Sequence, residues 1–109
     1  MAEAGSPDEA DAVDVPEASR YELRLGGRLV GFAAYRRKEG RIFFTHTEVE
    51  EPREGRGFGS RLADVALADA ARRGLEVVPL CPFIAYYIEG HPEYERLVAS
   101  ASPRPLADR

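Results

Sequence analysis

The chain is poor in cysteine and histidine: it has one cysteine, two histidines and no tryptophan in 109 residues. A single cysteine excludes an internal disulfide bond, so we expect a reducing compartment and a cytoplasmic protein. Two histidines and one cysteine, far apart in the sequence, are a poor ligand set, so we expect no metal. Because the chain has no long apolar run and its N-terminus lacks the basic and apolar parts of a signal peptide, we expect no membrane partner.

Basic residues are absent from the first 19 positions, which hold six acidic residues. The remainder is slightly basic, which suits an anionic small molecule but falls short of the basic footprint of a nucleic-acid-binding protein. Residues 1–18 offer almost nothing to bury, and we expect a disordered acidic tail there. The length leaves room for one domain, which we place at residues 19–98, and residues 99–109 are expected to be a flexible C-terminal tail.

The first half of the domain has the pattern of antiparallel strands. Residues 20–25 alternate between apolar and polar side chains, which predicts a half-buried strand. Gly26 and Gly27 suit a two-residue hairpin turn, and further strands are expected at residues 28–36 and 41–49. We therefore predict an antiparallel meander.

The second half predicts helices around one further strand. An alanine-rich helical pattern follows residue 60 and stops at Gly74, and residues 76–80 have the pattern of a short strand. Strand, helix and strand in this order imply a parallel pair. Because Pro79 cannot donate to a ladder, the pair should separate there and open a slot.

Two prolines mark the starts of the last helices. Pro82 suits the first position of a helix that runs to about Glu89, which makes Cys81 its N-cap residue. A second short helix is expected from His91 through Val98.

A glycine-rich turn, Glu54-Gly55-Arg56-Gly57-Phe58-Gly59-Ser60, lies between the third strand and the first helix. Its glycines allow a sharp turn, and the free N–H groups at the helix start favour an anion, most often phosphate. A Walker loop is excluded because Ser60 and Arg61 follow the last glycine, and the dinucleotide fingerprint is excluded because Ser60 replaces its third glycine. The alternative is a glycine-rich turn without a ligand.

Four sequence pieces, taken in order, resemble one known family. They are His46-Thr47-Glu48-Val49, Gly55-Arg56-Gly57-Phe58-Gly59, Cys81-Pro82-Phe83 and His91-Pro92-Glu93-Tyr94. Their order and spacing over residues 20–98 resemble the small single-domain N-acetyltransferases of the GNAT family, of the YjdJ type. The resemblance implies an α/β GNAT-like fold, with an antiparallel meander, a strand-helix-strand crossover, a mixed splayed sheet and C-terminal helices. It also implies acetyl-CoA as the acetyl donor.

The resemblance also implies where the donor binds. The implied residues are Val49, by backbone pairing with the pantetheine arm, and Arg53, Glu54, Gly55, Arg56, Gly57, Phe58, Gly59 and Ser60, around the pyrophosphate. The family usually has Gln or Arg where this chain has Glu54, and Arg53 could supply the missing positive charge. Larger family members also have acceptor-side elements that the first 19 residues cannot supply.

Four residues are candidates for catalysis. The thiolate of Cys81 would be stabilised by the helix N-terminus and could accept the acetyl group itself; the alternatives are direct transfer and a buried structural cysteine. Strict alternation places Ile42, Phe44, His46 and Glu48 on one face of the third strand. In such enzymes a glutamate near this position often takes the proton of the amine, so Glu48 is the candidate base, with His46 as its helper. Tyr87 is the candidate proton donor to the departing thiolate, and the sequence does not choose between it and Tyr86.

The predicted function is acetyl-CoA-dependent N-acetyl transfer to an unidentified amine, either directly or through an acetyl-cysteine. The alternative is a non-catalytic module of the same fold that binds CoA, acyl-CoA or another protein. We expect a monomer or a homodimer with no nucleic-acid partner.

Overall fold

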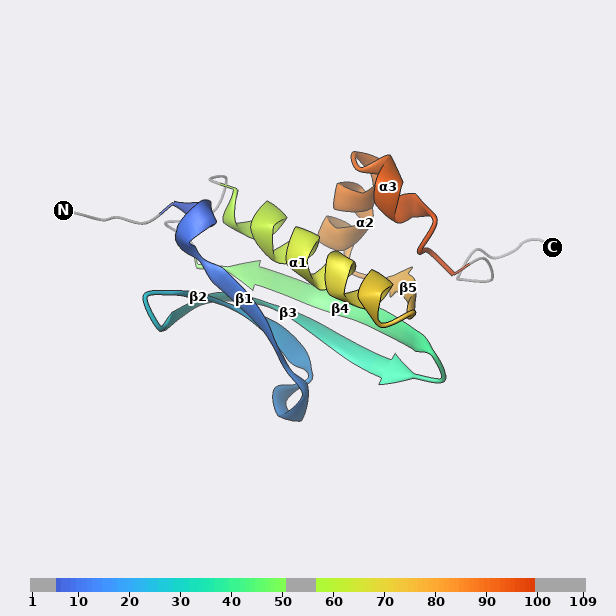
Figure 1. The fold of residues 1–109 in the computed structure, drawn as a ribbon, viewed down its shortest axis with the longest axis horizontal. Helices are drawn as coiled ribbons and strands as arrows, with labels where there is room; N and C mark the ends of the chain where they lie inside the picture. Colours follow the sequence, from blue (N-terminus) through green and yellow to red (C-terminus); the bar gives the residue numbers. More distant parts are fainter. Residues whose placement is uncertain (1–5, 51–56, 100–109) are drawn as a thin grey trace.

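The computed structural model describes residues 6–50 and 57–99, and within these a single mixed sheet forms the centre of the fold (Figure 1). Its strands are β1 (Asp11–Val15), β2 (Arg20–Leu25), β3 (Arg28–Lys38), β4 (Arg41–Val49) and β5 (Glu76–Pro79). They follow one another in sequence order across the sheet. The pairs from β1 to β4 are antiparallel, and β4 and β5 are parallel. The predicted meander and strand-helix-strand crossover are confirmed.

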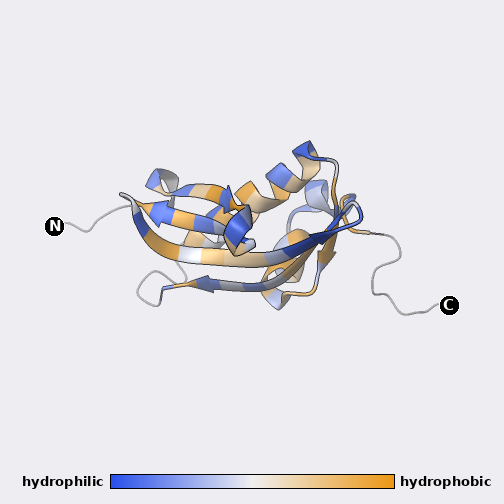
Figure 2. Cartoon of the chain, turned by 90° about the horizontal axis from the view of Figure 1, so that it is seen from below, coloured by the Kyte–Doolittle hydropathy of each residue, from blue (hydrophilic) through white to orange (hydrophobic). Residues whose placement is uncertain are grey.

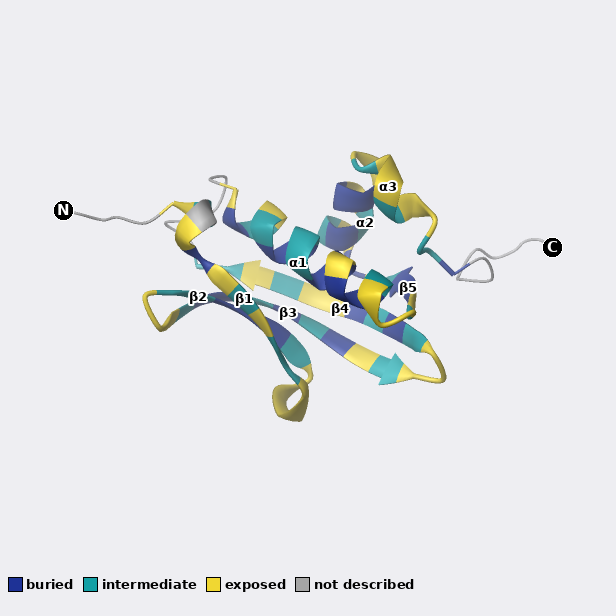
Figure 3. Cartoon of the chain, viewed as in Figure 1, coloured by how far each residue is buried: buried dark blue, intermediate teal, exposed yellow. Residues whose placement is uncertain are grey.

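The helices lie together on one face of this sheet. They are α1 (Phe58–Arg72), α2 (Pro82–Glu89) and α3 (Pro92–Glu95). Two short 3-10 turns, η1 (Pro7–Glu9) and η2 (Pro16–Ala18), precede and follow β1. Helix α1 lies across the sheet and contacts all five strands, and its buried side faces them (Figures 1 and 3). Within the described ranges no α-helix covers the opposite face, which Figure 2 shows from below. This uncovered face is called the open face below.

Local sequence explains the element boundaries. Cys81 is the N-cap of α2 and Pro82 occupies its first turn, as predicted. Strand β3 extends to Lys38 because only Glu39 and Gly40, with φ of 53° and 82°, form the turn. Helix α3 ends before the expected residue 98, because the chain then pairs with the edge of β5: the Val77 N–H donates to the Leu97 carbonyl at 2.8 Å.

The N-terminal region corrects the expectation of a disordered tail over residues 1–18. Strand β1 pairs with β2 along its whole length, and the Ala10 side chain is fully buried. Disorder was expected because the segment is short of apolar residues, but the carboxylate of Asp14 gains polar partners from β3 and α1. Residues 1–5 lie outside the described residues.

The C-terminal region differs from expectation at one residue. Ala99 is buried, and its N–H donates to the Val77 carbonyl at 2.9 Å, so this residue belongs to the folded domain. The rest of the expected flexible tail, residues 100–109, lies outside the described residues.

A β-bulge in β4 corrects the expected face assignment. Tyr35 on β3 pairs with Phe44, but the preceding Ala34 pairs with His46, so Thr45 is an extra residue on β4. An extra residue in one strand reverses the alternation of side chains beyond it.

After the bulge, Thr47 points to the same side as Ile42 and Phe44, toward the helices, where it contacts Cys81. His46 and Glu48 point to the open face instead. Sequence alternation had placed them with Ile42 and Phe44.

A polar network joins β1, β2, β3 and α1. It consists of Asp14, Tyr21, Tyr35, Arg37, Asp69, Arg72 and Arg73, and is called the Asp69 network below. The buried Asp69 carboxylate accepts hydrogen bonds from Tyr21 and from Arg73, both at 2.7 Å. Burial, together with the hydrogen bond that the hydroxyl donates to Asp14, raises the pKa of Tyr35 to about 12.

Candidate functional site

The slot predicted between β4 and β5 begins where their pairing ends. The last pair of the parallel register joins Phe44 and Pro79, and the Cys81 N–H donates to the Phe44 carbonyl at 2.8 Å just beyond it. Strand β4 continues to Val49, whereas the other chain turns into α2. The separation predicted from Pro79 is therefore confirmed.

Cys81 lies at the start of this separation, beneath the first turn of α2. Its side chain is 3% exposed, and its Sγ lies 3.3 Å from the Thr47 Oγ1. The thiol and the hydroxyl therefore form a polar contact between the two diverging segments. Thr47 was not among the sequence candidates, because a threonine in a strand carries no distinguishing signal and its orientation depends on the bulge.

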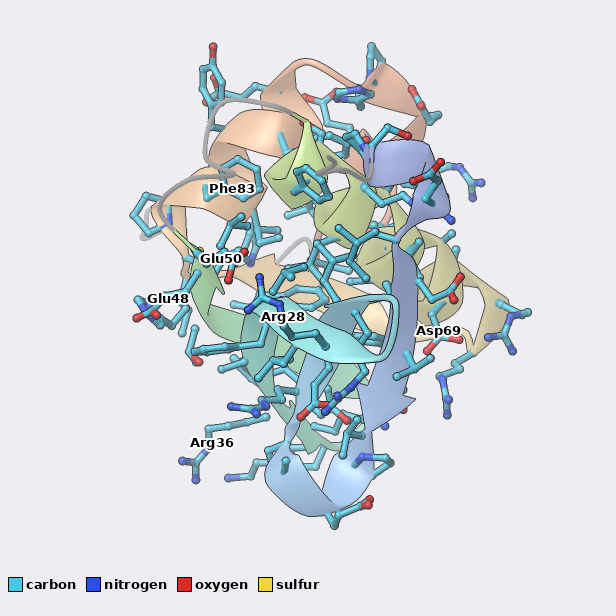
Figure 4. All side chains as sticks on the ribbon, turned by 90° about the vertical axis from the view of Figure 1, so that its left-hand side faces the viewer. Arg28, Arg36, Glu48, Glu50, Asp69 and Phe83 are labelled. Atoms are coloured by element: carbon cyan, nitrogen blue, oxygen red, sulfur yellow. The ribbon has the colours of Figure 1, made fainter. Side chains whose placement is uncertain are left out.

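Glu48 and His46 lie on the other side of β4, on the open face. The Glu48 Oε2 is 2.8 Å from the His46 Nε2, and their side chains are 62% and 57% exposed. Figure 4 shows Glu48 pointing outward from the end of β4. The structure thus brings the two candidates together but does not place them in contact with Cys81, because neighbouring strand residues point to opposite faces.

The first turn of α1 has the features of an anion site. Gly57 is its N-cap residue with a left-handed φ of 92°, and no side chain of the described residues caps the helix there. Such a helix start offers backbone N–H groups and the positive end of the helix dipole. The predicted pyrophosphate residues Arg53, Glu54, Gly55 and Arg56 lie outside the described residues.

The remaining residues of the glycine-rich turn have separate roles. Phe58 points into the core and is buried. A Cβ on Gly59 would lie 3.0 Å from the Phe83 Cζ, so this glycine permits the close packing of α1 against α2. Ser60 is exposed, and Val49 is partly buried against the core. The sequence pattern predicted that these glycines serve a ligand, and it gave no sign that Gly59 makes room for Phe83.

A cavity of about 440 Å³ lies along α2, from Phe83 to His91, and reaches Ser60 in the first turn of α1. Its lining includes Ser60, Phe83, Tyr87 and His91. Tyr87 is 9% exposed and stacks on His91 with ring centroids 3.9 Å apart, whereas Tyr86 is 74% exposed. Both tyrosines line the cavity, and Tyr87 is the one whose ring is buried against the neighbouring side chains. Burial raises the pKa of its hydroxyl above the ordinary value for tyrosine.

These features fit a CoA thioester. An uncapped helix start suits its phosphates, the unpaired edge of β4 beyond Phe44 suits an extended arm, and the cavity along α2 reaches the first turn of α1. For a metal the described residues offer no group of three or more His, Cys, Asp or Glu side chains that could bind one. None of the described helices is long and apolar enough to cross a membrane.

Comparison with known proteins agrees with this geometry. The family model of GCN5-related N-acetyl-transferases matches residues 20–97. A solved structure of a ribosomal-protein-alanine N-acetyltransferase from Brucella melitensis biovar Abortus 2308 is 24% identical, covers 83% of this chain and 68% of its own, and superposes with a TM-score of 0.54. No curated protein matches the chain. The structural likeness confirms the GNAT fold, and the family match confirms the resemblance to GNAT enzymes. The chain belongs to the GCN5-related N-acetyltransferase family, whose members transfer an acyl group from acetyl-CoA.

Proposed function

We propose that this protein transfers an acetyl group from acetyl-CoA to an amine that approaches the open face of the sheet. The observation that carries the proposal is the position of Cys81 and Glu48 on the two sides of β4, close to where β4 and β5 separate. A group bound where the two strands separate could be reached from both sides. Membership of an acetyltransferase family favours this reading over a non-catalytic CoA-binding module. The narrower YjdJ type and a cytoplasmic location stay predictions.

The donor site that we propose uses the start of α1 and the slot. The phosphates would accept hydrogen bonds from the backbone N–H groups of Gly57, Gly59 and Ser60. The pantetheine arm would lie beside Val49 and Thr47. Acetyl-CoA supplies an activated acetyl group as a thioester. The hydroxyl of Tyr87, which lines the cavity along α2, is the proposed proton donor to the departing thiolate.

The acceptor side that we propose lies at the end of β3 and β4. A cavity of about 170 Å³ there is lined by Leu29, Phe32, Glu48 and Glu50, with the backbone of residues 30 and 31. Glu50 is ion-paired with Arg28 at 2.7 Å, so the apolar floor and the exposed carboxylate of Glu48 are the features that suit a protonated amine on a short carbon chain. Glu48 would accept the proton that the amine must lose before it attacks, and His46 at 2.8 Å would orient the carboxylate.

The route that we propose passes through Cys81. Its sulfur attacks the thioester carbonyl, the carbon–sulfur bond to CoA breaks, and the thiol proton ends on the CoA thiol. The amine then attacks the acetyl-cysteine, and the thiol of Cys81 is restored. The contact at 3.3 Å between the Thr47 Oγ1 and the Cys81 Sγ supports this role, because it gives the sulfur a polar neighbour where β4 and β5 separate.

Incubation with acetyl-CoA followed by intact-mass measurement tests the function. We expect one acetyl group on the wild-type protein, none on Cys81→Ala, and release of CoA with loss of the adduct when a short primary amine is added. Thr47→Val, which removes the contact but not the thiol, should slow adduct formation about 10-fold, in line with one lost hydrogen bond to a charged group. Turnover of amines by Cys81→Ala at the wild-type rate would establish direct transfer, and no turnover with any amine by the wild-type protein would refute the function.

A further inference from the structure

Two neighbouring rows of side chains cross the open face from β2 to β4. Residues that pair in adjacent strands point to the same face, so the strand register defines these rows. They consist of Arg20, Ala34 and His46 in one row and of Glu22, Phe32 and Glu48 in the next. Phe32 of β3 therefore lies in the middle of this surface, with charged side chains of β2 on one side and of β4 on the other.

The β2 side of this surface is positively charged. The Glu22 carboxylate is 7% exposed and is shared by two arginines: the Arg20 Nη2 lies 2.9 Å from its Oε2, and the Arg24 Nη2 lies 2.7 Å from its Oε1. The hydrogen bond from Arg24 lowers the pKa of the Glu22 carboxyl below its ordinary value, so the group is ionised at neutral pH. Two guanidiniums and one carboxylate leave one net positive charge.

Of the two arginines, Arg20 is the one placed to bind a further anion. Its contacts with Glu22 use the Nε and Nη2, which leaves part of the five N–H groups of a guanidinium for another acceptor. Arg24 also donates from its Nη1 to the Gly27 carbonyl at 2.9 Å. The Arg20 guanidinium lies over the ring of Phe32, 4.7 Å from the centroid, so it leans from β2 toward the middle of the open face.

The β4 side carries an exposed carboxylate. Glu48 is 62% exposed, and the ring of its partner His46 lies 6.0 Å from the ring of Phe32. Neighbouring strands are about 4.8 Å apart, so β2 and β4 are about 10 Å apart, and the lean of Arg20 shortens the gap between the charged groups. Phe32 and Glu48 both line the cavity of about 170 Å³ on this face. An apolar ring thus separates a guanidinium from a carboxylate.

We propose that the acetyl acceptor is an ω-amino acid, with an amine at one end of a short carbon chain and a carboxylate at the other, and that Arg20 binds this carboxylate. The inference rests on the proposed function. The amine would lie against Glu48, the chain would cross the ring of Phe32, and the carboxylate would accept charge-assisted hydrogen bonds from Arg20. Such a molecule matches both ends of the surface, whereas an alkylamine would use only Glu48.

The test compares γ-aminobutyrate with butylamine, which have similar lengths and differ in the carboxylate. With the wild-type protein we expect kcat/KM for γ-aminobutyrate to exceed that for butylamine about 10- to 100-fold, the range for hydrogen bonds between charged groups. Arg20→Ala should remove this preference. The loss should appear in KM for γ-aminobutyrate rather than in kcat, because the contact holds the substrate equally before and during the reaction. Arg20→Lys, which keeps the charge but loses the planar fork, should give an intermediate preference.

The control is Arg36→Ala, which removes another exposed arginine from β3. Arg36 pairs with Phe43, further along β3 from Phe32, and Figure 4 shows its side chain apart from Glu48. If the preference depends on a specific contact and not on the net charge of the protein, Arg36→Ala should keep it.

Four outcomes would overturn the inference. Equal kcat/KM of the wild-type protein for the two acceptors would show that the carboxylate is not bound, although the turnover itself would uphold the proposed function. Equal losses for both acceptors in Arg20→Ala would show that Arg20 has a structural role. Loss of the preference in Arg36→Ala would show a general effect of surface charge. If the wild-type protein acetylates neither acceptor, the proposed function fails, and this inference fails with it.

Discussion

Replacing Asp69 by alanine should lower the free energy of unfolding by about 1–3 kcal/mol, because the change leaves the buried Tyr21 hydroxyl without its acceptor and removes the carboxylate that pairs with partly exposed arginines. The carboxylate accepts hydrogen bonds from Tyr21, Arg72 and Arg73. Without it the Asp69 network would hold three arginines against the single carboxylate of Asp14. A small domain has about 5–15 kcal/mol of stability in total, so this loss would be a measurable share of it.

Urea denaturation followed by circular dichroism measures this effect. The isosteric Asp69→Asn should cost less than Asp69→Ala, because it keeps the shape and one acceptor oxygen. Asp11→Ala, which removes an exposed acidic residue from β1, is the control and should change the stability by less than about 0.5 kcal/mol. A loss below about 1 kcal/mol in Asp69→Ala would show that the network does not join β1 to α1 in solution.

Glu48→Gln should lower kcat about 100- to 10,000-fold while the dissociation constant for acetyl-CoA stays unchanged. The amide keeps the size of the side chain but cannot accept the proton of the amine. Because Glu48 points to the open face and Cys81 to the opposite side of β4, the variant should still form the acetyl adduct and fail at the transfer to the amine.

His46→Gln distinguishes the contribution of His46 to the rate from that of the proposed base, Glu48. It removes the imidazole that lies 2.8 Å from the Glu48 carboxylate. We therefore expect kcat to fall about 10-fold, which is less than the fall expected for Glu48→Gln. Steady-state rates with one amine, together with adduct formation by intact mass, measure both variants. Glu48→Gln with more than half of the wild-type kcat would exclude Glu48 as the base.

The strands could be read from the sequence because their signals are local. Alternation over residues 20–25 and the adjacent glycines after it predicted β2 and its turn at the observed positions. The bulge at Thr45 has no such signal, since it arises from the pairing of β4 with β3. One extra residue was enough to move Glu48 to the face opposite the predicted one.

Strand β1 was missed because it lacks the composition of a buried strand. Its stability comes from partners distant in the chain, such as Arg37 and Arg73 for Asp14, and no local pattern reports them. Contacts between distant segments also decide which side chains form the candidate site, and the sequence does not show them. Pro82 was enough to predict Cys81 as an N-cap, but the choice of Tyr87 over Tyr86 and the contact of Thr47 with Cys81 depend on packing between elements.

The most direct test of the account is a thermal melt with and without acetyl-CoA, on the wild-type protein, Gly57→Glu and Gly27→Glu. Both glycines have a left-handed φ, 92° and 84°, so both variants carry similar backbone strain of about 1–2 kcal/mol, but only Gly57 lies at the start of α1. A hundredfold excess of ligand over its dissociation constant raises the free energy of unfolding by about 2.7 kcal/mol. This should raise Tm of the wild-type protein and of Gly27→Glu by about 10 °C. Gly57→Glu should show no shift. An equal shift in Gly57→Glu, or none in the wild-type protein, would contradict a donor site at the start of α1.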